Sequence, residues 1–319
     1  MKLNRAQFLL GLGALALPMQ ACVRSPSSLR LRLLWLNQAQ FAGVYLAQDN
    51  GLYRAAGLNV EIDPGGLGIN PVQMLATGTD KVAIVSATDI ILARARGIPI
   101  KSLGFIAPEN PTTYFVKADG PIRTIQDFRN RRVGVQVGFE TEYYLTAMMR
   151  QAGIPESNIE RVPVSNDMGP FFRDEIPIWP GYRIVQANIA RAQGIEVREF
   201  LPKDYGAAVP GDTLAALEST IENERAQLAA FVEATRAGWR AARETPEVGV
   251  DATLRYNPQA DRSLETVMLN SMLEIIFARG DDIISQDDAT WQNAIDFCRE
   301  YGLLESSTEM TPADIQAQL

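Results

Sequence analysis

The sequence predicts an α/β protein built from two similar lobes, and three observations predict it. Short strand-like and helix-like segments alternate from residue 29 onward, which is typical of a mostly parallel sheet with helices on both faces. Residues 133–164 repeat the strand, helix, glycine and strand plan of residues 31–63 with little sequence identity. The chain has 319 residues, enough for two compact lobes that each hold a core.

The first lobe begins with a leucine-rich strand. Leu29, Leu31 and Leu33 alternate with arginines, which is the pattern of a strand with one solvent-exposed face. Further on, Asn70 precedes a proline, which predicts a capped helix start, and Gly97 ends a helix. The elements expected here are strands at 29–36, 58–63, 81–85 and 100–106, and helices at 41–49, 71–77 and 89–96.

The second lobe is expected between two crossings of the chain. Residues 114–117 form the expected outward crossing, and the return falls near Tyr205 and Gly206. We therefore assign 29–115 and 206–319 to the first lobe and 116–205 to the second. The remaining expected elements are strands at 132–137, 159–164, 206–209 and 213–218, and helices at 140–152, 221–243, 247–255, 264–277 and 287–301.

The N-terminal segment has the layout of an export signal. Lys2 and Arg5 precede the apolar run 8–17, which is too short to span a membrane as a stable helix. Ala21 followed by Cys22 indicates a lipoprotein processing site, so 1–21 is interpreted as a signal peptide and 22–28 as a lipid-anchored tether. Simple secretion and a buried N-terminal helix are the alternatives. The expected location is the periplasm or the outer face of the cell membrane, with the lipid on Cys22 as the membrane contact.

Composition excludes several function classes. The net charge of -8 becomes about -10 without the signal, which disfavours nucleic acid as a partner. The chain has no histidine, which rules out histidine-based triads, general bases and metal ligands. Only Cys298 remains beside Cys22, so neither a disulfide framework nor a cysteine-rich metal site is expected. We expect no catalytic residue, no metal and no cofactor.

The most informative segment runs from Trp35 to Tyr45, where the first strand gives way to the first helix. Ligands of open α/β folds bind beyond the carboxyl ends of strands. This junction offers aromatic rings and neutral amides with no charged side chain, a surface suited to a flat polar molecule. Phe41 and Tyr45 have an equally good interpretation as the core face of the helix.

Four other clusters are candidates, each with a structural alternative. The glycine-rich loop 65–68 with Asn70 is a weak phosphate motif and a reasonable edge of a cleft. Thr88 and Asp89 begin a helix and could be a plain cap. Carboxylates at the helix start 140–142 would repel a sulfonate or nitrate, although they also complement the helix dipole. The fourth cluster, Asn166-Asp167-Met168 with Trp179 and Tyr182, is polar and aromatic, and Trp179, next to Pro180, has an equally good structural interpretation. The candidate ligand-binding residues are Trp35, Asn37, Gln40, Phe41, Tyr45, Gly66, Asn70, Thr88, Asp89, Glu140, Glu142, Asn166, Asp167 and Trp179.

These motifs resemble the SsuA/thiamine-precursor-type substrate-binding proteins of ABC transporters. The resemblance covers about 30–305. It rests on Trp35-x-x-Gln-Ala-Gln-Phe-Ala-Gly-x-Tyr45, Asn70-Pro-Val-Gln73 and Glu300-Tyr-Gly-Leu-Leu304, among other segments. It implies a type II periplasmic-binding-protein fold, whose two doubly wound lobes close on a ligand by hinge bending. The Gln-Ala-Gln-Phe-Ala-Gly segment is more similar to the riboflavin and pyrimidine branch than to the sulfonate branch.

The resemblance implies a non-enzymatic protein that captures a small heteroaromatic solute for an ABC permease and its ATPase, and we expect a monomer. A sulfonate or nitrate binder is one alternative. A second is an enzyme similar to the pyrimidine synthases of this fold, which use a histidine and a cysteine cluster that this chain lacks. A lipid-tethered sensor module is a third. The stretch 173–182 departs from the family pattern, so the ligand residues of the second lobe are the least defined.

Overall fold

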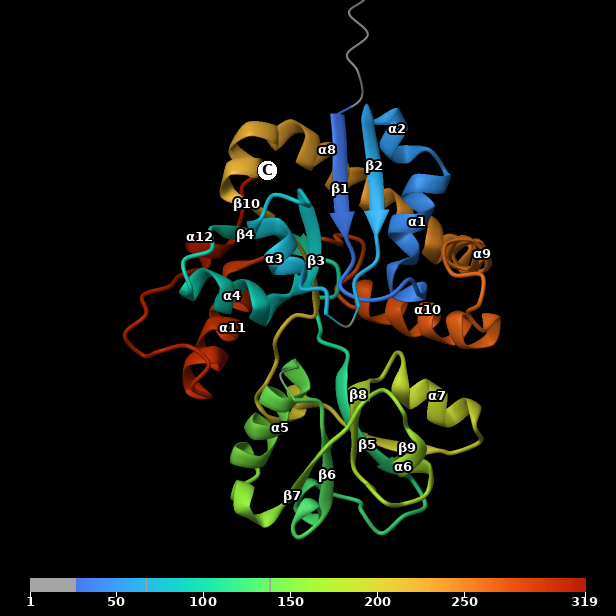
Figure 1. The fold of residues 1–319 in the computed structure, drawn as a ribbon, viewed down its shortest axis with the longest axis vertical. Helices are drawn as coiled ribbons and strands as arrows, with labels where there is room; N and C mark the ends of the chain where they lie inside the picture. Colours follow the sequence, from blue (N-terminus) through green and yellow to red (C-terminus); the bar gives the residue numbers. More distant parts are fainter. Residues whose placement is uncertain (1–26, 67, 138) are drawn as a thin grey trace, which may run out of the picture.

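The computed structural model describes residues 27–66, 68–137 and 139–319. The expected signal peptide, Cys22 and most of the tether lie outside these residues. Figure 1 shows two lobes connected by two stretches of chain. We call the part around the five-stranded sheet the first lobe and the part that contains β5 to β9 the second lobe.

The first lobe is organised around a mixed sheet. Its strands lie in the order β2 (Leu58–Asp63), β1 (Ser27–Arg32), β3 (Val82–Ser86), β10 (Asp212–Leu217), β4 (Ile100–Phe105). β1 is parallel to β2 and β3, whereas the returning β10 is antiparallel to both of its neighbours. Leu29 pairs with Val60 across the first two strands, so the alternating leucines form one buried face, as the sequence predicts.

Helices cover both faces of this sheet (Figure 1). One core contains Val82 and Ile84 and the helices on their side of the sheet; the other contains Ala83, Val85 and the helices of the opposite side. On the first side lie α1 (Ala42–Asp49), α8 (Glu218–Glu244), α9 (Pro246–Tyr256) and α10 (Arg262–Ile276), and on the second α4 (Ala87–Ala95) and α11 (Asp288–Glu300). The shorter helices are α2 (Leu52–Ala55), α3 (Pro71–Ala76) and α12 (Pro312–Ile315).

Close packing between α1 and α8 explains part of the Trp35–Tyr45 motif. A Cβ on Gly238 would lie 2.0 Å from the carbonyl oxygen of Gly43, and a Cβ on Gly43 would lie 2.2 Å from the ring of Trp239. Since real Cβ atoms do not approach so closely, both positions require glycine. Gly43 therefore serves helix packing.

The second lobe contains two small sheets. β8 (Trp179–Tyr182), β5 (Thr112–Lys117) and β9 (Val197–Phe200) form an antiparallel sheet, and β6 (Arg132–Val135) pairs in parallel with β7 (Glu160–Pro163). The helices are α5 (Glu140–Gln151), α6 (Gly169–Phe172) and α7 (Gln186–Ala192). The β6–α5–β7 unit repeats the parallel plan of β1 and β2, and its glycine Gly153 has a φ of 63°, like Gly57 at 76°.

Three expectations for secondary structure differ from the structure. Residues 114–117 belong to the central strand β5, and 206–209 form no strand. The second lobe is less parallel than expected because β5, β8 and β9 pair in antiparallel fashion. β8 was not predicted, because its Pro180 and Gly181 are unusual in a strand. The strand tolerates them because it lies at the edge of its sheet. The lobe limits at 115/116 and 205/206 stay a prediction, and β5 spans the first of them.

The crossings between the lobes lie side by side and are hydrogen-bonded to each other. The amides of Ile106 and Ala107 donate to the carbonyl of Asp212 at 2.8 and 3.0 Å, and the amide of Gly211 donates to Ala107 at 2.9 Å. The amide of Asn110 donates to Val209 at 3.2 Å. The junction is thus a short two-stranded ribbon, the kind of element that can absorb a change of angle between lobes.

Candidate functional site

The carboxyl ends of β1 and β6 bring aromatic rings from the two lobes together. Trp35 follows β1, and Phe139 precedes α5. Their ring centroids lie 6.4 Å apart with an interplanar angle of 78°, an edge-to-face contact between the lobes. Phe139 is 45% exposed although it is large and apolar. Phe139 was not among the predicted ligand residues, and the available signal was an aromatic residue directly before the helix start at Glu140.

Three carboxyl groups lie near one another, and one of them belongs to Glu140, the residue after Phe139. Glu140 begins α5, Asp89 lies in the first turn of α4, and Asp212 begins β10. β10 is antiparallel to β3, and Asp212 pairs with Ser86. Asp212 therefore lies at the carboxyl end of β3, where α4 begins. Asp89 and Asp212 both act electrostatically on Glu140, which raises the pKa of that carboxyl. We call Asp89, Glu140 and Asp212 the carboxyl cluster.

Neutral donors hold the carboxyl cluster. The Tyr182 hydroxyl and the Asn110 amide donate to Glu140, the latter at 3.1 Å. The side chain of Gln40 donates to Asp212 at 2.7 Å. Gln38 in turn donates to the side-chain oxygen of Gln40 at 2.6 Å. The two glutamine side chains thus form a hydrogen-bonded chain that leads to the buried carboxyl of Asp212. Among the residues that the structure describes, no lysine or arginine forms an ion pair with the cluster.

Burial sets the protonation of this cluster. Desolvation raises the pKa of Glu140 to about 7 and that of Asp212 to about 7. Desolvation by neighbouring protein also raises the pKa of the Asp89 carboxyl, whereas the residue as a whole stays exposed. Near neutral pH the cluster therefore offers both carboxylic acid donors and carboxylate acceptors. Such a surface favours ligands that donate hydrogen bonds and disfavours small anions.

Thr88 lies beside the cluster at the start of α4. Its hydroxyl is buried and has no hydrogen-bond partner among the described residues. It lies near the Tyr144 hydroxyl, and this proximity tends to lower the pKa of Tyr144, which burial raises more strongly. Tyr144 itself accepts a hydrogen bond from Asn110 at 3.1 Å. Thr88 thus keeps an unused hydroxyl next to the carboxyl cluster.

Other predicted residues serve packing. Phe41 and Tyr45 are fully buried in the first core, where Tyr45 stacks on Tyr256 at a centroid distance of 4.3 Å. Asn37 accepts a hydrogen bond from the Tyr45 hydroxyl at 3.0 Å and donates to the carbonyl of Tyr256 at 3.3 Å. Trp179 is buried in the second lobe with Phe171. These four positions fit the packing alternative.

The remaining predicted residues make local contacts. Glu142 pairs with Arg161 at 3.4 Å, and Asn70 caps α3 through the amide of Gln73 at 3.1 Å. Asp167 accepts a hydrogen bond from the amide of Gly169 at 2.9 Å, and Asn166 is exposed just after β7. Gly66 is buried with a φ of 139°, and a Cβ there would meet the Leu36 side chain at 3.1 Å.

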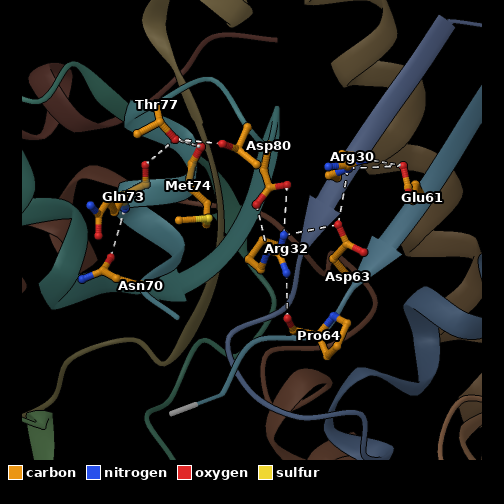
Figure 2. Close-up of polar contacts among 11 residues, drawn as sticks. Arg30, Arg32, Glu61, Asp63, Pro64, Asn70, Gln73, Met74, Thr77 and Asp80 are labelled. Carbon is orange, nitrogen blue, oxygen red and sulfur yellow. Dashed lines mark hydrogen bonds and ion pairs between the residues drawn. The ribbon is translucent and has the colours of Figure 1, made fainter. Parts of the chain in front are cut away.

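A partly buried arginine fixes the glycine-rich loop, a role that its local sequence does not indicate. Figure 2 shows Arg32 between β1, β2 and the start of β3. Its guanidinium donates to Asp80 at 2.8 Å, to Asp63 at 3.2 Å and to the carbonyl of Pro64 at 2.8 Å. Gly65 then donates its amide to the carbonyl of Trp35 at 2.9 Å. Arg32 therefore holds the loop that supports Trp35.

The described part of the chain shows neither a metal-binding group nor a spanning helix. No set of three or more acidic, cysteine or histidine side chains there is arranged to hold a metal ion. None of its helices combines the length and the apolar character that crossing a membrane requires.

The two lobes, the paired crossings and a candidate site between strand ends define the class of periplasmic-binding-protein folds. The chain belongs to the NMT1/THI5-like family, whose model matches residues 38–248. It is 27% identical over 300 residues to a riboflavin-binding protein RibY of Chloroflexus aurantiacus, covering 90% of this chain and 83% of that protein. It is 24% identical to a formylaminopyrimidine-binding protein of Halalkalibacterium halodurans, covering 87% of this chain and 86% of that protein.

The structure is similar to a solved binding protein of this fold. The periplasmic aliphatic sulphonate binding protein SsuA of Escherichia coli superposes with a TM-score of 0.72 over 92% of this chain and 93% of that chain, at 18% identity. This likeness shows the fold. A 4-amino-5-hydroxymethyl-2-methylpyrimidine phosphate synthase of Legionella pneumophila is also related, with 22% identity over 73% of this chain and 75% of that protein.

Proposed function

We propose that this protein is the extracytoplasmic solute-binding component of an ABC importer and captures a small heteroaromatic solute. The observation that carries the proposal is the carboxyl cluster, which accepts hydrogen bonds from neutral donors. Its Glu140 directly follows Phe139 of the Trp35–Phe139 contact. Aromatic rings suit a flat ring system, and uncompensated carboxyl groups suit its N–H and O–H donors. The names of the riboflavin-binding and formylaminopyrimidine-binding relatives support the same class.

Binding accounts for the site better than catalysis. The chain has no histidine, and burial raises the pKa of the internal Cys298 thiol to about 12. A thiol that stays protonated is a poor nucleophile and a poor metal ligand. The relationship to a pyrimidine phosphate synthase is therefore interpreted as shared ancestry of the fold without the catalytic groups.

We further propose that Cys22 carries a lipid and that the protein works as a monomer beside its permease and ATPase. Ala21-Cys22 after the apolar run supports lipid attachment. Replacing Cys22 with serine should release the protein from the membrane fraction and abolish incorporation of labelled palmitate. A Cys298→Ser variant is the matched control and should stay at the membrane.

The solute class is tested by thermal melting with riboflavin, formylaminopyrimidine, taurine and nitrate. A binding ligand raises the melting temperature in proportion to the logarithm of its concentration above the dissociation constant. We expect a saturable increase with riboflavin or formylaminopyrimidine and none with taurine or nitrate. An increase with taurine or nitrate alone would show that the protein is a small-anion binder.

A further inference from the structure

A cavity behind the ribbon of crossings is separate from the proposed solute site. It has a volume of about 100 Å³ and is lined by both crossings, by Arg183 and Lys203 of the second lobe, and by Ile275 and Arg279 at the end of α10. Asn110 lies between this cavity and the carboxyl cluster, because it lines the cavity and donates to Glu140 at 3.1 Å. The cavity thus touches both lobes and both crossings.

The charge on this cavity is opposite to that of the chain. Arg183, Lys203 and Arg279 face Glu109 alone among acidic residues of the lining, whereas the whole chain carries a net charge of -8. Lys203 is compensated, since it pairs with Glu109 at 2.6 Å. The two arginines, one from each lobe, have acidic partners as well, but these partners, Glu199 and Asp287, lie outside the lining of the cavity.

Arg183 has hydrogen-bond donors that the fold does not use. Its closest acidic partner is Glu199 at 3.7 Å, and its guanidinium forms no hydrogen bond within the described residues. Arg279 uses one nitrogen, for Asp287 at 3.3 Å and the Thr290 hydroxyl at 3.2 Å. A guanidinium carries five N–H donors in a planar fork that matches two oxygens of one anion. Both arginines therefore have capacity for an anion in the cavity.

The size and the walls of the cavity limit what it can hold. One water molecule occupies about 30 Å³ of liquid, so the cavity has room for a group of only a few non-hydrogen atoms. Leu201, Val209 and Ile275 supply apolar walls, whereas the side chains of Arg183 and Arg279 remain partly exposed to solvent. Phosphate, sulfate and short carboxylates share this size and this chemistry.

We propose that the cavity behind the crossings is a second binding site for a small oxyanion or a short carboxylate. The bound anion would join the two lobes through Arg183 and Arg279. An anion held by one arginine of each lobe resists any change of angle that separates them. Its occupancy would therefore favour one arrangement of the lobes, independently of the solute.

The test is thermal melting of the full chain without solute in sodium phosphate, sodium sulfate or sodium acetate, each compared with sodium chloride at equal ionic strength. The variants are Arg183→Gln and Arg279→Gln. The matched control is Arg54→Gln, an exposed arginine of α2 that lies far from the crossings (Figure 1). We expect at least one anion to raise the melting temperature of the wild type and of Arg54→Gln by about 2–4 °C at tenfold excess over the dissociation constant.

Loss of this increase in both hinge variants, together with a stoichiometry near one by isothermal titration, would support the site. A rise with phosphate and sulfate alone identifies an inorganic oxyanion, and a rise with acetate alone identifies a carboxylate. An equal rise in all four proteins, or no saturable rise with any anion, would overturn the proposal. Solute affinity in chloride buffer shows whether the hinge variants are folded, and it tests the solute proposal separately.

Discussion

At the scale of single residues, the account depends on carboxyl groups that the fold buries without a cationic partner. Asp212 is 1% exposed, and within the described residues its side-chain carboxyl accepts one hydrogen bond, from Gln40. Burial raises its pKa from 3.8 to about 7, so the folded state binds a proton more tightly than the unfolded state. Stability is therefore lost as the pH rises between these two values.

An Asp212→Asn variant should remove this loss while keeping an oxygen that accepts from Gln40. At pH 8 the variant should be more stable than the wild type by on the order of 3 kcal/mol, whereas at pH 3 the two should be similar. Urea unfolding at both pH values measures the difference. Asp204→Asn, on the exposed surface, should change little at either pH. The same difference at pH 3 and pH 8 would contradict the raised pKa.

Residue roles could be predicted from the sequence only where the partner lies nearby in the chain. The cap at Asn70 and the acidic start of α5 were predicted correctly. The bond from Gln40 to Asp212 joins residues 172 positions apart, and no local pattern reveals it. The same limit applies to Arg32, whose alternation with leucines predicted only a wet strand face.

At the scale of secondary-structure elements, Arg32 connects β1, β2 and the start of β3 (Figure 2). Replacing it with methionine would leave the buried Asp80 carboxyl without its counter-charge, which is strongly destabilising. We expect Arg32→Met to lower the free energy of unfolding by about 3–5 kcal/mol. Arg30→Met, which breaks solvent-exposed pairs with Glu61 and Asp63, should cost much less. Equal effects in urea unfolding would exclude the proposed role of Arg32.

The contact between α1 and α8 makes a second prediction for elements. Gly238→Ala should destabilise the protein by about 3 kcal/mol, because the helices must separate to admit the Cβ. Gly57→Ala meets open space, and only its φ of 76° opposes alanine, so a cost of about 1 kcal/mol is expected. Chemical denaturation ranks the two variants, and a reversed order would refute the packing argument.

Elements with one buried face were predicted well, and elements that depend on long-range pairing were not. The alternating leucines located β1, which covers Ser27–Arg32 where 29–36 was expected, and Gly57 and Gly153 marked the ends of two similar units. β8 was missed because its Pro180-Gly181 pair is typical of a turn. β5 was taken for a crossing, since its identity as a strand depends on β8 and β9, which the sequence does not place.

At the scale of the whole molecule, the lobes meet through groups suited to a change of angle. The Trp35–Phe139 contact and the hydrogen bond from Tyr182 to Glu140 belong to the proposed solute site. Asn110 lies between that site and the cavity behind the crossings. A solute bound between the lobes would replace water on the exposed Phe139 ring and on Asp89. The permease could then distinguish loaded from empty protein by the angle between lobes.

The measurement that tests the central claim most directly is isothermal titration of the wild type and of Glu140→Gln with riboflavin and formylaminopyrimidine. We predict saturable binding of at least one of these solutes to the wild type at a stoichiometry near one. Affinity should fall by about 10- to 100-fold in Glu140→Gln, because a charge-assisted hydrogen bond is lost. Glu160→Gln, altered in β7 at an exposed pair with Arg132, should bind nearly as the wild type does. Absence of binding for both solutes, or equal affinity in Glu140→Gln, would contradict a heteroaromatic site built on the carboxyl cluster.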